Sequence, residues 1–205
     1  MKLYFAPLAC SMATRIAFYE AGAPVTFVQV DNHTKRTAED EDFLAINPAG
    51  QVPALTLDDG GVLVENAAIL IYLNDIFASP KDARARAEFS RWIGTINSEL
   101  HTPFVTVLDP KSPEEAKLYA LDHLRKRFAL LDAHLKDREF LLGDYSAADG
   151  YLTVILNWTQ VRGPELDAFP ALKAYFARML ARPSIARALG EELPMYIDEQ
   201  RRRAA

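Results

Sequence analysis

The pattern of hydrophobic residues changes near residue 80, and this change limits the folds that the chain can adopt. Before it, short strand-like segments alternate with segments of helical spacing, whereas after it almost every segment has helical spacing. The turn residues of Phe77-Ala-Ser-Pro-Lys81 mark the change. A strand–helix–strand beginning favours a parallel pair of strands with a right-handed crossover. We therefore expect an α/β domain at 1–77, a linker at 78–82 and an all-helical domain at 83–205.

Four strands and two long helices are expected in the first domain. The strands fall at 2–6, 25–30, 54–57 and 62–64, and the helices at 11–21 and 65–77. Asp58-Asp59-Gly60-Gly61 between the last two strands is a hairpin signal, which adds an antiparallel edge to the sheet. The second domain begins with a long amphipathic helix over 84–108 that Pro103 should kink, and further helices follow Pro113, Gly143, Pro170 and Pro183.

Composition and charge exclude several classes of protein. One cysteine among 205 residues rules out an internal disulfide framework and any multi-cysteine metal site, so no metal is expected. A net charge of −5 gives no support for binding nucleic acid or an anionic membrane. The longest apolar run, 67–73, is far shorter than the roughly 20 residues of a membrane span. The sequence is that of a soluble globular protein, and a cytoplasmic location is expected.

The single cysteine, Cys10, precedes Ser11, which is expected to cap the first helix. Backbone N–H groups and the dipole at a helix N-terminus stabilise an anion and lower the pKa of a thiol. A free cysteine is otherwise usually a small buried hydrophobe, and position alone does not decide between the two readings. The sequence has no C-x-x-C motif, so thiol–disulfide chemistry would need an external thiol.

Two further segments of the first domain are candidates for ligand binding. Pro53 follows a turn at the entry of a strand, where a cis bond would free the backbone of Val52 to pair with an extended peptide, although a trans proline is the commoner state. Asn66 is a good N-cap for the second helix, whose N–H groups would attract a carboxylate, and Glu65 could accept a bond from an ammonium group. Ordinary capping explains these two residues equally well.

The helical half offers one candidate for chemistry and one for stability. His101 lies on the small, polar side of the long helix, together with Asn97, although a lone histidine on a helix is more often structural. Ser146 and Asp149 form a capping box before an apolar run, which indicates a role in folding.

Taken in their order along the chain, these motifs resemble the cytosolic glutathione transferases. The first-domain motifs are Cys10-Ser11, Asn47-Pro48-x-Gly50-Gln51-Val52-Pro53 and Glu65-Asn66-x-Ala68-Ile69. The helical half adds Phe140-Leu-x-Gly143 and Ser146-x-Ala148-Asp149. Cys10-Ser11 and Ser98-Glu99-Leu100-His101 make the chain most similar to the bacterial beta class, over essentially its whole length.

The resemblance implies a thioredoxin-like N-terminal domain with a mixed four-stranded sheet, an all-α C-terminal domain and a homodimer. It implies glutathione as co-substrate, no tightly bound cofactor, and Pro53 in the cis state. The site residues that it implies fall into three groups. The catalytic group is Cys10, Ser11 and His101. The glutathione-binding group is Lys35, Gln51, Val52, Pro53, Glu65 and Asn66, where Asn66 replaces the usual Ser or Gly. The group around the second substrate is Pro7, Leu8, Ala9, Val105 and Trp158.

Three functions are compatible with these residues. The first is conjugation of the glutathione thiolate to a small hydrophobic electrophile, typical of detoxification, with Ser11, the helix N-terminus and a bond from Cys10 stabilising the thiolate. Lowering the thiol pKa by two units needs about 2.7 kcal/mol, the size of one or two charge-assisted hydrogen bonds plus a dipole. The second is deglutathionylation through Cys10. The third is a non-catalytic ligand-binding or protein-interaction module.

Overall fold

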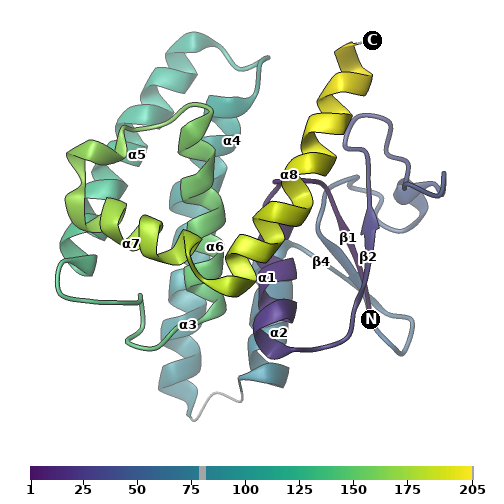
Figure 1. Cartoon of the computed structure of the whole chain (residues 1–205), viewed down its shortest axis with the longest axis horizontal. Helices are drawn as coiled ribbons and strands as arrows, with labels where there is room; N and C mark the ends of the chain where they lie inside the picture. Colours follow the sequence, from purple (N-terminus) through teal and green to yellow (C-terminus); the bar gives the residue numbers. More distant parts are fainter. Residues whose placement is uncertain (79–81, 205) are drawn as a thin grey trace. The chain divides into compact units, whose positions relative to one another are not determined.

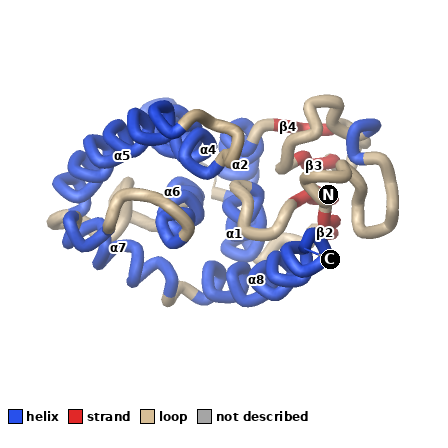
Figure 2. The backbone as a smooth tube through the Cα atoms, turned by 90° about the horizontal axis from the view of Figure 1, so that it is seen from above, coloured by secondary structure: helices blue, strands red, loops and turns tan. Residues whose placement is uncertain are grey.

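A computed structural model of the chain describes residues 1–78 and 82–204, and these form two compact units. The first unit consists of residues 1–78 together with 183–204, and the second of residues 82–182. Figure 1 labels most of the elements of both, and Figure 2 labels strand β3. Residues 79–81, at the centre of the expected linker, lie outside the described residues.

The first unit is built on a mixed sheet of four strands in the order β2-β1-β3-β4. Strand β1 (Lys2–Phe5) runs parallel to β2 (Thr26–Gln29) and antiparallel to β3 (Ala54–Thr56), which pairs with β4 (Val62–Val64). Helix α1 (Ser11–Ala21) makes the crossover between β1 and β2. The expected parallel pair and antiparallel hairpin edge are therefore confirmed.

Two helices besides α1 complete the first unit. Helix α2 (Asn66–Phe77) follows β4 and buries Ile69, Leu70 and Leu73. Helix α8 (Pro183–Ala204) comes from the far end of the chain and packs against α1. The unit that contains the sheet is thus formed from two segments of sequence, with all of the second unit between them.

The second unit is all-helical. Its longer helices are α3 (Ala83–Ile96), α4 (Thr102–Leu108), α5 (Glu114–Leu135), α6 (Ala147–Asn157) and α7 (Pro170–Leu180). Residues 148–156 of α6 are all buried, because α6 runs through the middle of the unit (Figure 2). Such an all-round buried helix needs apolar residues on every face. The capping box before α6 is confirmed, since the Ser146 N–H donates to Asp149 Oδ2 at 2.9 Å.

The prediction of one helix over 84–108 kinked at Pro103 was wrong in its detail. A π-helical turn, Asn97–His101, separates α3 from α4, and the N–H of Thr102 donates to the carbonyl of Asn97, five residues back. Pro103 lies in the first turn of α4 and has no N–H to donate. The irregularity therefore precedes the proline and contains His101. Single π turns of this kind are frequent at functional sites.

Candidate functional site

Cys10 lies at the N-terminus of α1 but its thiol is buried. The residue is 8% exposed, and Sγ lies 3.5 Å from the carbonyl oxygen of Val52, to which the thiol donates. Burial raises the pKa of Cys10 to about 12, although the backbone N–H groups of Ser11 and Cys10 act in the opposite direction. Desolvation therefore outweighs the helix N-terminus here, so the structure does not favour a lowered thiol pKa, which was one of the two readings left open by the sequence. Cys10 is a hydrogen-bond donor at neutral pH.

Ser11 is not the cap that the sequence predicts. Cys10 occupies the N-cap position with helical backbone angles, and Ser11 is the first residue of α1. The fully buried Ser11 hydroxyl donates to the carbonyl of Ala6 and accepts from its N–H, both at 3.2 Å. The hydroxyl thus joins the end of β1 to the start of α1, which leaves the Ser11 backbone N–H facing the Cys10 thiol.

The turn before β3 presents the backbone that the resemblance assigns to a peptide ligand. The Val52–Pro53 bond is cis, as the resemblance implies, and Val52 is half-buried. The turn is held from two sides, since Lys35 Nζ donates to the Gly50 carbonyl at 2.7 Å and Asn47 Nδ2 donates to the Gln51 carbonyl at 2.7 Å. The Gln51 side chain is exposed.

The start of α2 differs from the expected capping by Asn66. The N-cap is Glu65, at a positive φ of 70° and without a side-chain cap, so the first N–H groups of α2 have no capping side chain. Asn66 turns toward α1, where its Oδ1 accepts from the Thr14 hydroxyl at 2.9 Å. Both residues are buried, and Asn66 Nδ2 is covered without a partner among the described residues.

A buried ion pair that sequence reasoning missed holds the loop before Cys10. Leu8, between Pro7 and Ala9, has a positive φ of 58°, and its N–H donates to Glu192 Oε2 of α8 at 2.7 Å. Glu192 is 0% exposed, and its other oxygen lies 2.8 Å from Arg15 Nε. Burial raises the pKa of Glu192 to about 7, against the opposing effect of Arg15. Because the partners are 184 positions apart in the sequence, no local motif marks the contact.

The ion pair is embedded in aromatic and charged surroundings. The Arg15 guanidinium lies 4.1 Å from the ring centre of Phe5 and 4.0 Å from that of Phe27. Its Nη1 also contacts Glu191 Oε2 at 2.8 Å. A cation enclosed by two rings and two carboxylates is rigidly held. It therefore fixes the segment between β1 and α1.

In the second unit, His101 is held by aromatic neighbours. Its Nδ1 lies 2.7 Å from the hydroxyl of Tyr151, and its ring packs against Trp158 at 5.2 Å between centres. Burial lowers the pKa of His101 to about 4, so the imidazole is neutral at physiological pH. Val105, on α4, is 53% exposed. The structure thus brings together His101 and Trp158, and it adds Tyr151, whose position in α6 gave no sequence signal.

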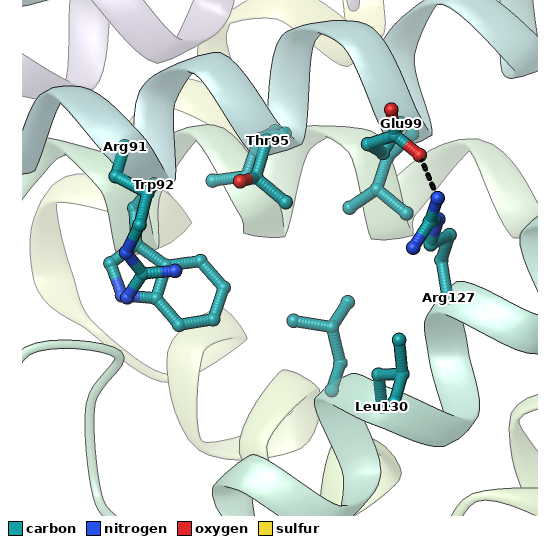
Figure 3. Close-up of a pocket in the computed structure, with 9 residues that line it drawn as sticks. Arg91, Trp92, Thr95, Glu99, Arg127 and Leu130 are labelled. Carbon is teal, nitrogen blue, oxygen red and sulfur yellow. Dashed lines mark ion pairs between the residues drawn. The ribbon is translucent and has the colours of Figure 1, made fainter.

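A cavity of about 180 Å³ lies elsewhere in the second unit, between α3, the π turn and α5 (Figure 3). Trp92 and Leu130 contribute apolar surface, and Glu99 pairs with Arg127 at its edge. Leu130 is 62% exposed. None of the expected site residues lines this cavity.

The described part of the chain contains no candidate metal site and no candidate membrane-spanning helix. Its histidine, cysteine and acidic side chains form no group of three or more that could hold a metal ion. Among the described helices, none has the length and apolar character needed to cross a membrane.

The fold and the first-unit contacts define a class of protein. A mixed sheet with a cysteine at the first helix, opposite a cis-proline turn, is a thioredoxin-like arrangement, and here one chain combines it with an all-helical unit. Two family models match: glutathione S-transferase, N-terminal domain, over residues 1–75, and glutathione S-transferase, C-terminal domain, over residues 69–183. The chain belongs to the glutathione S-transferase family.

Individual relatives agree over nearly the full length. Glutathione S-transferase GstA of Escherichia coli O157:H7 is 36% identical over 198 residues, covering 94% of this chain and 98% of the relative. The solved ternary complex of BphK, a bacterial glutathione S-transferase, has a TM-score of 0.90 at 38% identity, covering 94% of this chain and 99% of that one. A beta class enzyme of Sphingomonas chungbukensis has a TM-score of 0.88 at 40% identity, covering 94% and 98%. The expected similarity to the bacterial beta class is therefore confirmed.

Proposed function

We propose that the protein binds glutathione on its first unit and transfers the glutathione thiolate to a small hydrophobic electrophile. The observation that carries the proposal is the half-buried Val52 backbone at cis-Pro53, beside the Cys10 thiol, together with the uncapped start of α2, all in one unit. An extended peptide pairs with free backbone groups, and a carboxylate is stabilised at a helix N-terminus. A γ-glutamyl tripeptide offers both groups, with a thiol between them.

The remaining glutathione contacts are proposed as the resemblance to the family implies them. The Val52 backbone pairs with the cysteinyl unit, the α2 N-terminus takes the γ-glutamyl carboxylate, and Glu65 accepts from the adjacent ammonium. Lys35 and Gln51 are assigned to the glycyl carboxylate. Asn66 contributes its backbone N–H, because its side chain is committed to Thr14. Trp158, beside His101, is assigned to the electrophile.

In this mechanism Cys10 acts as a donor. The Cys10 S–H turns from the Val52 carbonyl to the glutathione sulfur, where it joins the Ser11 backbone N–H in stabilising the thiolate. Hydrogen bonds to a charged acceptor contribute about 1.5–3 kcal/mol each. A thiol whose pKa is about 12 suits this role and is a poor nucleophile for mixed-disulfide chemistry.

Two variants of Cys10 separate conjugation from deglutathionylation. We expect Cys10→Ala to raise the pKa of bound glutathione by about one to two units, since one charge-assisted bond is lost. Cys10→Ser should restore most of that shift, because serine keeps a donor. The measurements are thiolate absorbance against pH and conjugation of a haloaromatic electrophile. If both variants conjugate as wild type but lose deglutathionylation, Cys10 belongs to the redox reaction instead.

Retention of the wild-type protein on immobilised glutathione tests the proposal as a whole. Binding with turnover of the haloaromatic electrophile supports transfer, and tight binding without turnover of several electrophiles contradicts it. Failure to bind at all would favour the interaction-module reading. Reduced glutathione and reduced thiols are characteristic of the cytosol, which is the location that we propose.

We further propose that the protein is a homodimer, and that the cavity beside Leu130 lies in the interface. Leu130 exposes apolar surface at the mouth of a cavity lined by other apolar side chains, and such surface favours association when a second copy covers it. Leu130→Asp should lower the mass in light scattering from dimer to monomer, whereas Leu118→Asp, at another exposed leucine of α5, should leave it unchanged. A wild-type monomer, or a dimeric Leu130→Asp variant, would contradict this assignment.

A further inference from the structure

One hydroxyl group lies between two polar side chains of the π turn, those of its first and last residues. The Tyr151 hydroxyl, carried by the buried helix α6, lies 3.0 Å from Asn97 Oδ1 and 2.7 Å from His101 Nδ1. Asn97 and His101 are the first and last residues of the π turn. Tyr151 is 0% exposed, so its ring has no freedom to move between alternative partners.

The number of protons in this cluster determines the histidine tautomer. A phenol has one proton to donate, and in this arrangement Tyr151 donates it to Asn97 Oδ1. The short contact to His101 then requires a proton on Nδ1, donated to the lone pair of the Tyr151 oxygen. We infer that Asn97 and Tyr151 are positioning residues that hold His101 in the tautomer with its proton on Nδ1.

The tautomer decides what His101 can bind. With the proton on Nδ1, Nε2 carries a lone pair and accepts a hydrogen bond from a thiol, N–H or O–H group. It repels an anionic atom such as a thiolate, and stabilisation of the thiolate is therefore left to Cys10 and the Ser11 N–H. The low pKa of His101 agrees with this, since burial keeps the ring from gaining a second proton. This step rests on the proposed function and on the catalytic role of His101 that the resemblance to the family implies.

The tautomer can be observed directly, without glutathione. In protein carrying ¹⁵N-labelled histidine, the two ring nitrogens of a neutral imidazole give distinct chemical shifts. The signals of His101 are assigned by their loss in His101→Gln. We expect the wild-type protein to show the Nδ1–H tautomer. The Nε2–H tautomer, or a mixture of the two, would overturn the inference even if the transferase is active.

Two variants of the partially exposed Asn97 test the mechanism of the effect. Asn97→Leu removes the acceptor and frees the Tyr151 proton for Nδ1, so His101 should switch to the Nε2–H tautomer. Asn97→Asp keeps an acceptor oxygen and should keep the wild-type tautomer. Tyr175→Phe is the matched control, because it removes another buried phenol hydroxyl, bonded to Asp149, and should leave His101 unchanged. An unchanged tautomer in Asn97→Leu would contradict the inference.

Kinetic measurements provide a second test, because a purely structural role of Asn97 would not produce the expected result. Asn97→Leu should lower kcat about three- to tenfold while the KM for glutathione changes less than about twofold, as for loss of one hydrogen bond in the transition state. The same substitution in a His101→Gln background should have no further effect on kcat. Equal losses in both backgrounds would assign Asn97 to folding alone. A wild-type protein without transferase activity would refute the proposed function and leave the tautomer result standing.

Discussion

The surroundings of Cys10 and those of His101 use different kinds of contact. Around Cys10, most bonds of the side chains end on backbone groups, whereas around His101 one side chain holds the next. The backbone partners near the thiol are Val52, Ala6 and Gly50, and the side chains around His101 are Asn97, Tyr151 and Trp158. A site made of backbone depends on strands and turns being in place, while a site made of side chains depends on the residue types at a few positions.

In the first unit, a buried ion pair holds the backbone of the site in place. Arg15 and Glu192 lie under the loop of Leu8, where a strained backbone conformation needs a fixed partner. The second unit has no such device near His101 within the residues described here, and its histidine is kept neutral by burial. We therefore expect substitutions of the anchoring residues Arg15 and Glu192 in the first unit to change the stability of the whole fold. Substitutions around His101 in the second unit should have local effects.

The largest expected effect comes from removing the buried cation. Arg15→Met should lower the free energy of unfolding by about 3–5 kcal/mol above pH 7, because it leaves the Glu192 carboxylate buried without its partner. Arg187→Met, which removes an exposed, solvent-screened cation paired with Glu191, should have a much smaller effect. Urea unfolding measures both, and equal costs would remove the distinction between anchor and surface pair.

A second prediction contrasts the pH dependence of the two regions. The folded pKa of His101 is lowered to about 4, so between this value and about 6.5 the unfolded chain binds more protons and stability rises with pH. The folded pKa of Glu192 is raised to about 7, so between about 4.5 and 7 the folded chain binds more protons and stability falls as pH rises.

Difference curves isolate each contribution. The free energy of unfolding of wild type minus that of His101→Gln should increase across the first window, and that of wild type minus Glu192→Gln should decrease across the second. Each change is at most about 3 kcal/mol. If both stability differences changed in the same direction with pH, burial would not be the main cause of the pKa shift at one of the two sites.

The smallest effect is expected at the bond between α1 and α2. Thr14→Val should cost about 1–2 kcal/mol, because Asn66 Oδ1 loses its hydrogen bond in a buried place. Thr153→Val is the matched control: its hydroxyl bonds the Asp149 carbonyl within a helix and also the Tyr175 hydroxyl, but both partners keep another hydrogen bond, and we expect a smaller cost. Thermal unfolding compares the two, and a larger loss at Thr153 would reverse the order.

Local signals in the sequence were sufficient for much of the fold. Short strand-like segments indicated the strands, Asp58–Gly61 indicated the hairpin, and Ser146 with Asp149 indicated the start of α6. These features depend on neighbours within a few residues, and so a short window of sequence contains them.

Features that depend on distant residues were not accessible in this way. The sequence left two readings of Cys10 open, because the helix start that lowers a thiol pKa is visible in sequence, whereas the burial that raises it is tertiary. The contact of Glu192 with Leu8 needs the full chain to be folded. The π turn left no sign in the sequence, because its apolar spacing is that of an ordinary helix. Only Pro103 indicated an irregularity.

Helix α8 has a consequence for how the protein is made. A ribosome releases residues 1–78 long before residue 192, so the emerging sheet lacks the carboxylate that neutralises Arg15 and holds the Leu8 N–H. Synthesis proceeds at about 5–20 residues per second, which leaves the first unit incomplete for several seconds while the second unit is translated. The N-terminal half, although first in the chain, is therefore completed last during biosynthesis.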